Sequence, residues 1–258
     1  YHDQWRRDRD RDKYRHMLRF ARRLPRIRAQ VERDLARPGL PRDKVLALVV
    51  RIMELTHMRV GNAEYAKLNR SYGLTTLRVR HVAIEGSELR FEFTGKSGKR
   101  WRLPVKDRRI ARTIRALQEL PGQHLFKYVD EDGKTHPVRS SEVNDYLRQV
   151  TDGDHTAKTF RTWGATLMAT VGLGALPPPT TQREGRHIVT DLLAAVAGAL
   201  NNTPAVCRRS YVHPRVVESY LDGSLGPLWA STSARGSSLL SRDERRLVQL
   251  LERVGEAS

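Results

Sequence analysis

The sequence predicts a mainly α-helical protein with one small three-stranded antiparallel β-sheet. Two patterns lead to this prediction. Apolar residues recur every three or four positions through most of the chain, which is the period of an amphipathic helix. Between about residues 75 and 106 the pattern changes to β-branched and aromatic residues separated by short turns, which is typical of a β-meander. With 258 residues and no internal repeat, one large domain over 1–258 can bury a sizeable core.

The first half of the chain is expected to contain two helices followed by the sheet. Residues 1–35 are interpreted as an extended start followed by a helix, which Pro25 should bend or split. Pro41 then precedes a strongly apolar helix that is expected to end near Gly61. The meander follows, with turns at Gly86 and at 95–98. The apolar face of the first helix is expected to comprise Leu18, Phe20, Ala21, Leu24, Ile27 and Val31.

The second half is expected to be helical, with one short hairpin or loop over 128–138. Its helices are predicted over 108–120, 140–150, 156–172 and 190–200, the last with Thr190 as N-cap residue. Residues 176–185 are a predicted linker or loop. A further helix over 203–221 is interrupted at Pro214, and a helical tail over about 226–258 includes an amphipathic helix.

Charge is the strongest global property of the chain. Lys and Arg number 47 against 29 Asp and Glu, which gives a net charge of +18 at pH 7. A field of this sign attracts polyanions, and double-stranded DNA is the expected partner because phosphate contacts supply most non-specific affinity. An anionic membrane surface is the alternative partner. No run of about 18 apolar residues exists, so no membrane span is expected.

Several kinds of site are not expected from the sequence. The single cysteine, Cys207, allows neither an intrachain disulfide nor a cysteine zinc cluster. No His-Glu-x-x-His, Walker or GxGxxG motif occurs, so neither a metal nor a nucleotide cofactor is predicted. Any chemistry on phosphate is therefore expected to proceed without ATP or metal. A reducing cytoplasm, with the protein associated with the nucleoid, is the simplest expected location.

Four segments together resemble a known family. They are "MRVGNAEYAK" (58–67), "TGKSGK" (94–99), "KTFRTWG" (158–164) and "LNNTPAVCRRSYVHP" (200–214). In this order they resemble a type IB DNA topoisomerase of the poxvirus-like and bacterial kind, over about residues 1–225. The resemblance implies the catalytic fold that these topoisomerases share with tyrosine recombinases. It also implies a monomer, and the small N-terminal clamp domain of the family is expected to be absent from this chain.

The resemblance implies roles for five catalytic residues. Tyr211 matches the nucleophile that becomes linked to a DNA 3′-phosphate. Arg59 and Arg161 match the arginines that contact the non-bridging phosphate oxygens, and Lys96 matches the lysine that protonates the 5′-oxygen leaving group. Asn202 stands where poxvirus-type members carry a histidine. Its amide can donate a hydrogen bond to a phosphoryl oxygen but cannot be a cation.

Four further residues are predicted to bind DNA. Lys158 lies three positions before Arg161, so both side chains are expected on one side of a helix, facing a phosphate. Tyr65 falls where the family has a DNA contact, and Lys99 and Arg80 are the other candidates. The remainder of the Lys158 helix is expected to be mostly core, through Phe160, Trp163, Ala165, Leu167 and Met168.

Elementary phosphoryl-transfer chemistry agrees with these roles. The protein must position the reactants and stabilise charge on the equatorial oxygens, for which planar, always-charged arginines are suited. A protonated phenol is a poor nucleophile, and nearby guanidinium groups would stabilise the phenolate. Because a phosphotyrosine bond conserves the energy of the cut bond, religation would need no ATP.

Two alternative functions remain open. A tyrosine recombinase shares the fold and the Arg, Lys, Arg, Tyr set, but usually carries His-x-x-Arg where this chain has Lys158-Thr-Phe-Arg161. Recombinases also tend to have Leu-Gly-His where this chain has Leu200-Asn-Asn. A non-catalytic, basic DNA-binding protein would explain the charge equally well. In isolation, Tyr211 could be a packing residue and Lys96 a solvated turn residue; only their joint occurrence favours catalysis.

Overall fold

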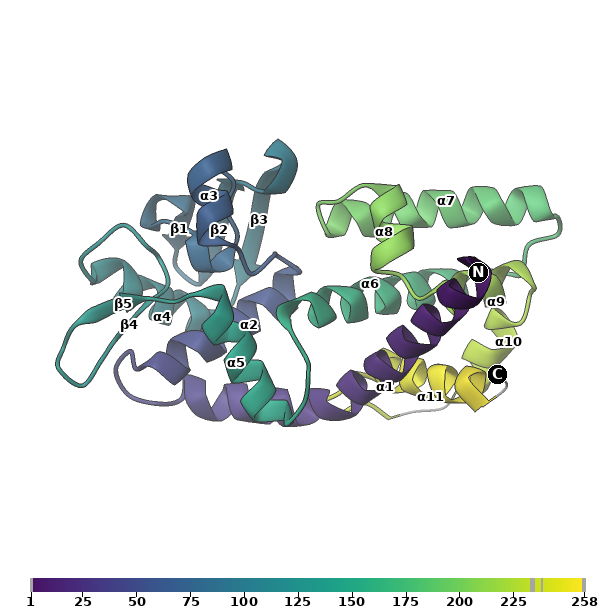
Figure 1. Ribbon diagram of the computed structural model, residues 1–258, viewed down its shortest axis with the longest axis horizontal. Helices are drawn as coiled ribbons and strands as arrows, with labels where there is room; N and C mark the ends of the chain where they lie inside the picture. The colour runs from purple at the N-terminus through teal and green to yellow at the C-terminus, as the bar shows by residue number, and fades with distance from the viewer. Residues whose placement is uncertain (1, 233–234, 238, 257–258) are drawn as a thin grey trace. The chain divides into compact units, whose positions relative to one another are not determined.

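The computed structural model (Figure 1) describes residues 2–232, 235–237 and 239–256, with side chains from residue 16 to residue 253. The chain divides into two compact units. The continuous unit is Arg26–Lys158, and the two-segment unit combines Tyr1–Pro25 with Thr159–Ser258. The fold is mainly helical with one three-stranded antiparallel sheet, as the sequence predicts.

The continuous unit contains both β-sheets. Its helices are the C-terminal part of α1 (His2–Leu35), α2 (Arg42–Thr56), α3 (Ala63–Asn69), α4 (Arg108–Glu119) and α5 (Ser140–Thr151). The main sheet has the order β1-β2-β3, formed by β1 (Val82–Glu85), β2 (Glu88–Thr94) and β3 (Arg100–Lys106). Short 3₁₀ turns lie at η1 (Leu74–Thr76), η2 (Val79–His81) and η3 (Lys96–Gly98). The predicted hairpin is present as β4 (Lys127–Val129) paired with β5 (Thr135–Pro137).

The core of the continuous unit follows the alternation of its strands and the faces of its helices. Along β2, Leu89, Phe91 and Phe93 are buried while the residues between them are exposed. Phe93 stacks on Trp101 of β3 with ring centroids 6.0 Å apart. In α4, Ile110, Ala111, Ile114 and Leu117 are buried, one helical face, while arginines occupy the exposed face. Burial of these apolar faces stabilises the sheet and helix against each other.

Helices are the only regular secondary structure in the described residues of the two-segment unit. It contains the N-terminal part of α1 and then α6 (Ala157–Gly174), whose first two residues belong to the continuous unit. The other helices are α7 (Gln182–Ala199), α8 (Pro204–Ser210), α9 (Pro214–Leu221), α10 (Leu225–Ser231) and α11 (Arg242–Glu256). Helix α8 packs beside α7 (Figure 1). Aromatic rings join α1 to α6, because Phe20 lies 5.0 Å from Phe160 and 6.3 Å from Trp163.

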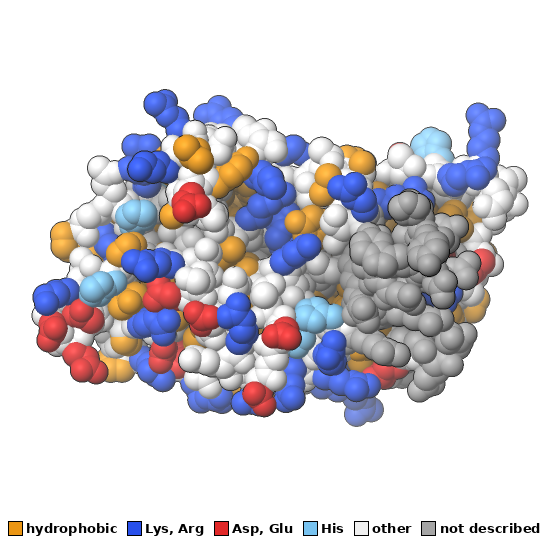
Figure 2. All heavy atoms as spheres, in the orientation of Figure 1, with side chains coloured by type: hydrophobic (Ala, Val, Ile, Leu, Met, Phe, Trp, Pro, Cys, Tyr) orange, Lys and Arg blue, Asp and Glu red, His pale blue; other side chains and the backbone are white. Residues whose placement is uncertain are grey.

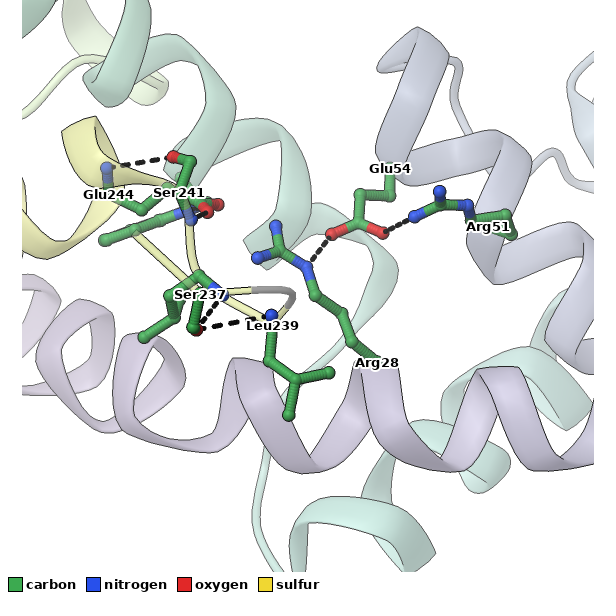
Figure 3. A network of polar contacts seen from close by, with 9 residues as sticks. Arg28, Arg51, Glu54, Ser237, Leu239, Ser241 and Glu244 are labelled. Carbon is green, nitrogen blue, oxygen red and sulfur yellow. Dashed lines mark hydrogen bonds and ion pairs between the residues drawn. The ribbon is translucent and has the colours of Figure 1, made fainter. Parts of the chain in front are cut away.

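Each unit contains polar contacts between its own residues, and Figure 3 shows one example from each unit. In the continuous unit, Glu54 on α2 accepts from Arg28 on α1 at 2.6 Å and from Arg51 at 3.3 Å. In the two-segment unit, Ser241 and Glu244 form a reciprocal cap on α11: the Ser241 N–H donates to Glu244 at 2.8 Å, and the Glu244 N–H donates to Ser241 Oγ at 3.2 Å.

Two predicted boundaries in the first half are wrong. Helix α1 begins at His2, not after an extended start, and it continues through Pro25. Arg, Lys and Gln have high helix propensity, which extends the helix towards the N-terminus. Helix α2 ends at Thr56, before Gly61, because His57 adopts the left-handed conformation (φ 54°) and its N–H bonds to Met53 O. A left-handed residue terminates a helix by capping its carbonyls.

The start of the meander and the cap of α7 also differ from the prediction. Residues 74–76 form η1 and residues 79–81 form η2 instead of a strand. At η1 the Thr76 hydroxyl bonds to both the N–H and the carbonyl of Gly73, and at η2 the Arg78 N–H donates to the His81 ring. Such local side-chain bonds compete with strand pairing. Helix α7 starts at Gln182 with Thr181 as N-cap, whereas Thr190 lies inside the helix and bonds back to Arg186 O at 2.7 Å.

In the first helix the structure buries Met17 where the sequence pattern favours Leu18. Met17 is 1% exposed, and Leu18 is only half-buried. Phe20, Ala21, Leu24, Ile27 and Val31 are all buried, as predicted. One register position at the beginning of the apolar face is therefore the only error in that list.

Candidate functional site

Tyr211 lies in the three-residue linker between α8 and α9, where the chain leaves a helix that ends at Ser210. Its N–H bonds to Cys207 O at 2.9 Å, and the Val212 N–H shares that acceptor at 3.1 Å. Pro214 cannot continue a preceding helix and stands at the first position of α9. Val212 and His213 are buried, whereas the Tyr211 side chain is half-exposed. The linker thus presents a phenol on an anchored backbone.

Arg161 on α6 lies against this phenol. Its guanidinium carbon is 5.0 Å from the centre of the Tyr211 ring. The Nη2 group donates to the carbonyl of Leu200 at 3.0 Å, at the C-terminus of α7. A cation at a helix C-terminus is favourable because the last carbonyls carry partial negative charge. Arg161 is 3% exposed, so α7 and the Tyr211 linker fix its position.

Asn202 belongs to the same small region. Asn201, two residues after the end of α7, adopts the left-handed conformation (φ 47°), and the Asn202 N–H bonds back to Ala197 O at 2.8 Å. The turn therefore places Asn202 two residues beyond the carbonyl that holds Arg161. The two-segment unit brings together three of the five predicted catalytic residues, namely Tyr211, Arg161 and Asn202.

Arg59 lies in the continuous unit, on the extended segment after α2. The Arg59 carbonyl accepts from the Leu74 N–H at 2.9 Å, and the Val60 carbonyl accepts from the Thr75 N–H at 2.7 Å. These bonds require the two segments to approach closely. A Cβ atom on Gly73 would lie 2.6 Å from the Gly61 Cα, a distance that only a glycine permits.

Lys96 lies at the tip of the β2–β3 hairpin, also in the continuous unit. The Gly95 N–H bonds to Lys99 O at 2.7 Å, and Ser97 and Gly98 both have left-handed φ values, 62° and 72°. A Cβ on Gly95 would lie 2.7 Å from Trp101 Nε1, so the hairpin closes directly on that buried ring. The Lys96 side chain is exposed at the tip.

Residues 72–75 connect the Arg59 segment with the Lys96 hairpin. The Tyr72 N–H bonds to Thr94 O at 2.8 Å, two residues before Lys96, while the Leu74 N–H bonds to Arg59 O. The Tyr72 ring also packs on His81, with centroids 4.5 Å apart. One short segment therefore supports the backbone near Arg59 and near Lys96, the two predicted catalytic residues of this unit.

The four predicted DNA-binding residues all lie in the continuous unit. Lys158 and Arg80 are exposed, and Lys99 is half-buried. Tyr65, 38% exposed, is on α3, a fully described helix in which no side chain is buried. The Tyr65 N–H bonds to the Asn62 side chain at 2.8 Å, which caps the helix.

The part of α6 that follows Lys158 is buried on all sides, and the prediction that Lys158 and Arg161 face a phosphate from one side of the helix stays a prediction. Lys158 is exposed, but every residue from Thr159 to Thr166 is buried, Arg161 included. Arg161 can be buried because the Leu200 carbonyl accepts from its guanidinium. Phe160, Trp163 and Ala165 are core as predicted, whereas Leu167 and Met168 are only half-buried.

His81 is the most strongly perturbed histidine near these residues. Burial, reinforced by the positive charges of Arg80 and Arg78, lowers the pKa of His81 to about 4. The ring is therefore neutral at pH 7, and its Nδ1 accepts from the Arg78 N–H at 3.1 Å. His81 thus orders the turn that carries Arg80.

Lys and Arg side chains are spread over the face shown in Figure 2, which suits a polyanionic partner. On the face shown in Figure 2, the red carboxylates are densest at the left edge. Figure 1 draws the β4–β5 hairpin there, whose turn carries Asp130, Glu131 and Asp132.

In the part of the chain that the structure describes, no group of three or more His, Cys, Asp or Glu residues could hold a metal ion. No helix in that part has both the length and the apolar character to cross a membrane.

Two structural residues near the site were not singled out from the sequence. Gly73 holds the Arg59 segment, and Thr166 on α6 bonds to the carbonyl of Tyr211 at 3.1 Å. The sequence signal for Gly73 is the run "YGLTT", in which a glycine precedes two hydroxyl residues. Thr166 carries no comparable signal, because a threonine inside an apolar helix usually bonds only to its own helix.

The family model and the relatives that match this chain are all DNA topoisomerases. The family model for the catalytic core of eukaryotic DNA topoisomerase I matches residues 2–225. The chain is 30% identical to DNA topoisomerase 1B of Acanthamoeba polyphaga mimivirus over 218 residues, which is 82% of this chain and 65% of that relative. It is 20% identical to DNA topoisomerase 1B of vaccinia virus (strain Copenhagen) over 207 residues, which is 77% of this chain and 61% of that relative.

A cellular protein is also similar. The mitochondrial DNA topoisomerase I of Rattus norvegicus is 28% identical over 152 residues, which is 56% of this chain and 24% of that protein. The chain spans less than two thirds of the length of each of these relatives.

Proposed function

Because the chain belongs to the DNA topoisomerase I catalytic-core family, we propose that it cuts and rejoins one strand of double-stranded DNA as a type IB topoisomerase. In this proposal it relaxes supercoils without ATP or metal, through a covalent link between Tyr211 and a DNA 3′-phosphate. The observation that carries the proposal is the half-exposed Tyr211 phenol on its anchored linker, with the Arg161 guanidinium 5.0 Å from the ring centre.

The first chemical step forms one P–O bond and breaks another. The Tyr211 oxygen attacks the phosphorus, the bond from the phosphorus to the 5′-oxygen breaks, and the phenol gives its proton to water. Arg161, and Arg59 from the other unit, are proposed to stabilise the charge that develops on the non-bridging oxygens. Asn202 is proposed to donate a hydrogen bond to one of those oxygens.

Lys96 is proposed to donate a proton to the departing 5′-oxygen. Its exposed position at a hairpin tip supports this role, because the tip is accessible to a DNA backbone. Once the 5′-hydroxyl end is free, that strand rotates about the intact one. Religation reverses the step: the 5′-hydroxyl attacks the phosphorus and returns its proton to Lys96, the bond from the phosphorus to the Tyr211 oxygen breaks, and the phenolate takes up a proton from water.

Binding before the cut is proposed to rely on backbone phosphates. Lys158, Lys99, Arg80 and Tyr65 are the proposed contacts, and the net charge of +18 supplies long-range attraction. We propose that one copy of the protein suffices, since all five catalytic roles are filled by residues of one chain.

The test is relaxation of supercoiled plasmid in the presence of a chelator and without ATP. Wild-type protein should relax the plasmid and give a covalent complex that migrates with DNA after denaturation. Tyr211→Phe removes only the nucleophilic oxygen and should abolish both. Strand exchange at a specific site without relaxation would favour a tyrosine recombinase. DNA binding with no covalent complex would favour a non-catalytic DNA-binding protein.

The role of Lys96 needs a separate substrate. Lys96→Met should slow cleavage of normal DNA about 10²-fold or more, the usual range of general acid catalysis. A substrate with sulfur in place of the 5′-oxygen expels a thiolate, which needs no protonation because a thiol is far more acidic than an alcohol. Lys96→Met should cut that substrate as fast as wild type; an equal defect on both substrates would contradict the role.

A further inference from the structure

Thr166 on α6 makes two hydrogen bonds to the linker that carries Tyr211. Its hydroxyl donates to the Tyr211 carbonyl at 3.1 Å, and its oxygen accepts from the His213 N–H at 3.2 Å. A threonine hydroxyl has one proton to donate and lone pairs to accept, so one side chain can make both bonds. Thr166 is fully buried, with 0% exposure, so water cannot take over these two hydrogen bonds if the hydroxyl is removed.

These bonds complete the fixation of the linker. The Tyr211 and Val212 N–H groups bond to Cys207 O at the end of α8, and the His213 carbonyl accepts from the Val216 N–H at 3.2 Å on α9. The His213 ring caps α9, its Nδ1 accepting from the Arg215 N–H at 3.2 Å. Both neighbouring helices therefore hold the ends of the linker, and Thr166 holds its middle from a third helix.

Helix α6 also carries Arg161, five residues earlier. The guanidinium lies 5.0 Å from the Tyr211 ring and the Thr166 hydroxyl 3.1 Å from the Tyr211 carbonyl. One rigid helix thus sets the position of the cation and of the nucleophile's backbone. A reaction whose rate depends on in-line geometry is sensitive to displacements of about 1 Å.

We propose that Thr166 is a positioning residue of the strand-transfer reaction. By holding the Tyr211 backbone, it keeps the phenolic oxygen of Tyr211 in its position relative to Arg161. This inference rests on the proposed function, in which Tyr211 is the nucleophile. Thr166 touches neither DNA nor the reacting atoms; it acts through the backbone of residues 211–213. Because cleavage and religation pass through the same transition state, loss of the register slows both and leaves their ratio unchanged.

The key variant is Thr166→Val, which keeps the shape of the side chain and removes the hydroxyl. Thr166→Ser keeps the hydroxyl and serves as the rescue variant. Thr170→Val is the matched control: Thr170 lies one turn later on α6 and is also fully buried, and among the residues that the structure describes its hydroxyl bonds only to the carbonyl of Thr166, at 2.8 Å. If Thr166→Val does not fold, Thr166→Ala is measured in its place.

The measurement is the rate constant for formation of the covalent complex in a single turnover, with DNA at saturating concentration. The DNA is designed so that the cut end dissociates, which prevents religation. Thr166→Val should lower the rate constant about 10- to 100-fold, while the final amount of complex and the DNA affinity stay within about twofold. Religation should slow by the same factor. Thr166→Ser should return the rate to within about threefold of wild type, and Thr170→Val should differ from wild type by no more than that.

Four results would overturn the inference. They are a wild-type rate for Thr166→Val, a loss of final amount at an unchanged rate constant, no rescue by Thr166→Ser, or an equal defect in Thr170→Val. Tyr211→Phe, measured in parallel, separates this failure from failure of the proposed function. If Tyr211→Phe still forms the complex, both proposals are wrong; if it is inert while Thr166→Val is fast, only the role of Thr166 is wrong.

Discussion

Replacing Gly73 by alanine would test how the fold positions Arg59. The added Cβ would lie 2.6 Å from the Cα and the N of Gly61 and 2.7 Å from the carbonyl oxygen of Arg59. All three are backbone atoms, so no flexible side chain can move aside. Ordinary contacts begin at 3.4 Å, and 3.4 − 2.6 leaves the two segments 0.8 Å too close. The Arg59–Gly61 segment must therefore move away from residues 73–75.

This displacement has consequences for stability and for catalysis. The bonds from Leu74 N–H to Arg59 O and from Thr75 N–H to Val60 O would weaken. Overpacking of this kind destabilises a protein by about 1–3 kcal/mol. Since a misplacement of about 1 Å can slow an enzyme on the order of 10²-fold, a shift of 0.8 Å should lower the cleavage rate about 10- to 100-fold.

The assay combines single-turnover covalent-complex formation with urea unfolding. Gly226→Ala on α10 is the matched control, because its Cβ would meet no atom within 4 Å; it should cut DNA at the wild-type rate. If Gly73→Ala cleaves as fast as wild type while it remains folded, the argument that this glycine contact sets the position of Arg59 is refuted.

Three other predictions concern stability, each followed by urea unfolding. Because the pKa of His81 is lowered to about 4, the unfolded chain binds a proton that the folded chain does not between about pH 6.5 and 4. Stability should therefore fall as pH drops through this range, by up to about 3 kcal/mol, and His81→Gln should flatten the slope; an unchanged slope would contradict the cause. Trp163→Phe removes the indole donor to Glu244 Oε1 at 3.2 Å and should destabilise by about 1–3 kcal/mol, whereas a change below about 0.3 kcal/mol would show that this bond adds nothing. Lys127→Met removes the ammonium that donates to the carbonyls of Leu120 at 2.6 Å and Gly122 at 2.9 Å, and should reduce the free energy of unfolding by a similar amount. The control, Lys134→Met at an exposed position, should leave the free energy of unfolding unchanged; equal losses in the two variants would contradict a stabilising role of the Lys127 bonds.

Local patterns were sufficient for most elements. The alternation of Leu89, Phe91 and Phe93 predicts β2, and the glycines at 95 and 98 predict the hairpin that carries Lys96. These signals depend on the side-chain period and on backbone conformations within a few residues. One of the errors occurs where a side chain overrides its local pattern, because the Thr76 hydroxyl bonds to the backbone of Gly73.

For the candidate site, too, the sequence predicts some features and not others. The order of four short motifs is enough to nominate Tyr211, Arg161, Arg59 and Lys96. It does not reveal that Arg161 is buried at the end of α7, because the partner is a backbone carbonyl 39 residues away. Sequence periodicity assigns Lys158 and Arg161 to one side of the helix, and it carries no signal for that carbonyl.

The sequence by itself determined the helical class of this protein, its sheet, its excess of positive charge and the identity of the residues proposed to react. These depend on residue types and on spacings within one turn or one strand. Only the tertiary structure decided which contacts hold those residues. The Thr166 bonds to residues 211 and 213 and the contact of Gly73 with Gly61 join segments distant in sequence. Such contacts are fixed by packing of the whole chain, which a local pattern does not encode.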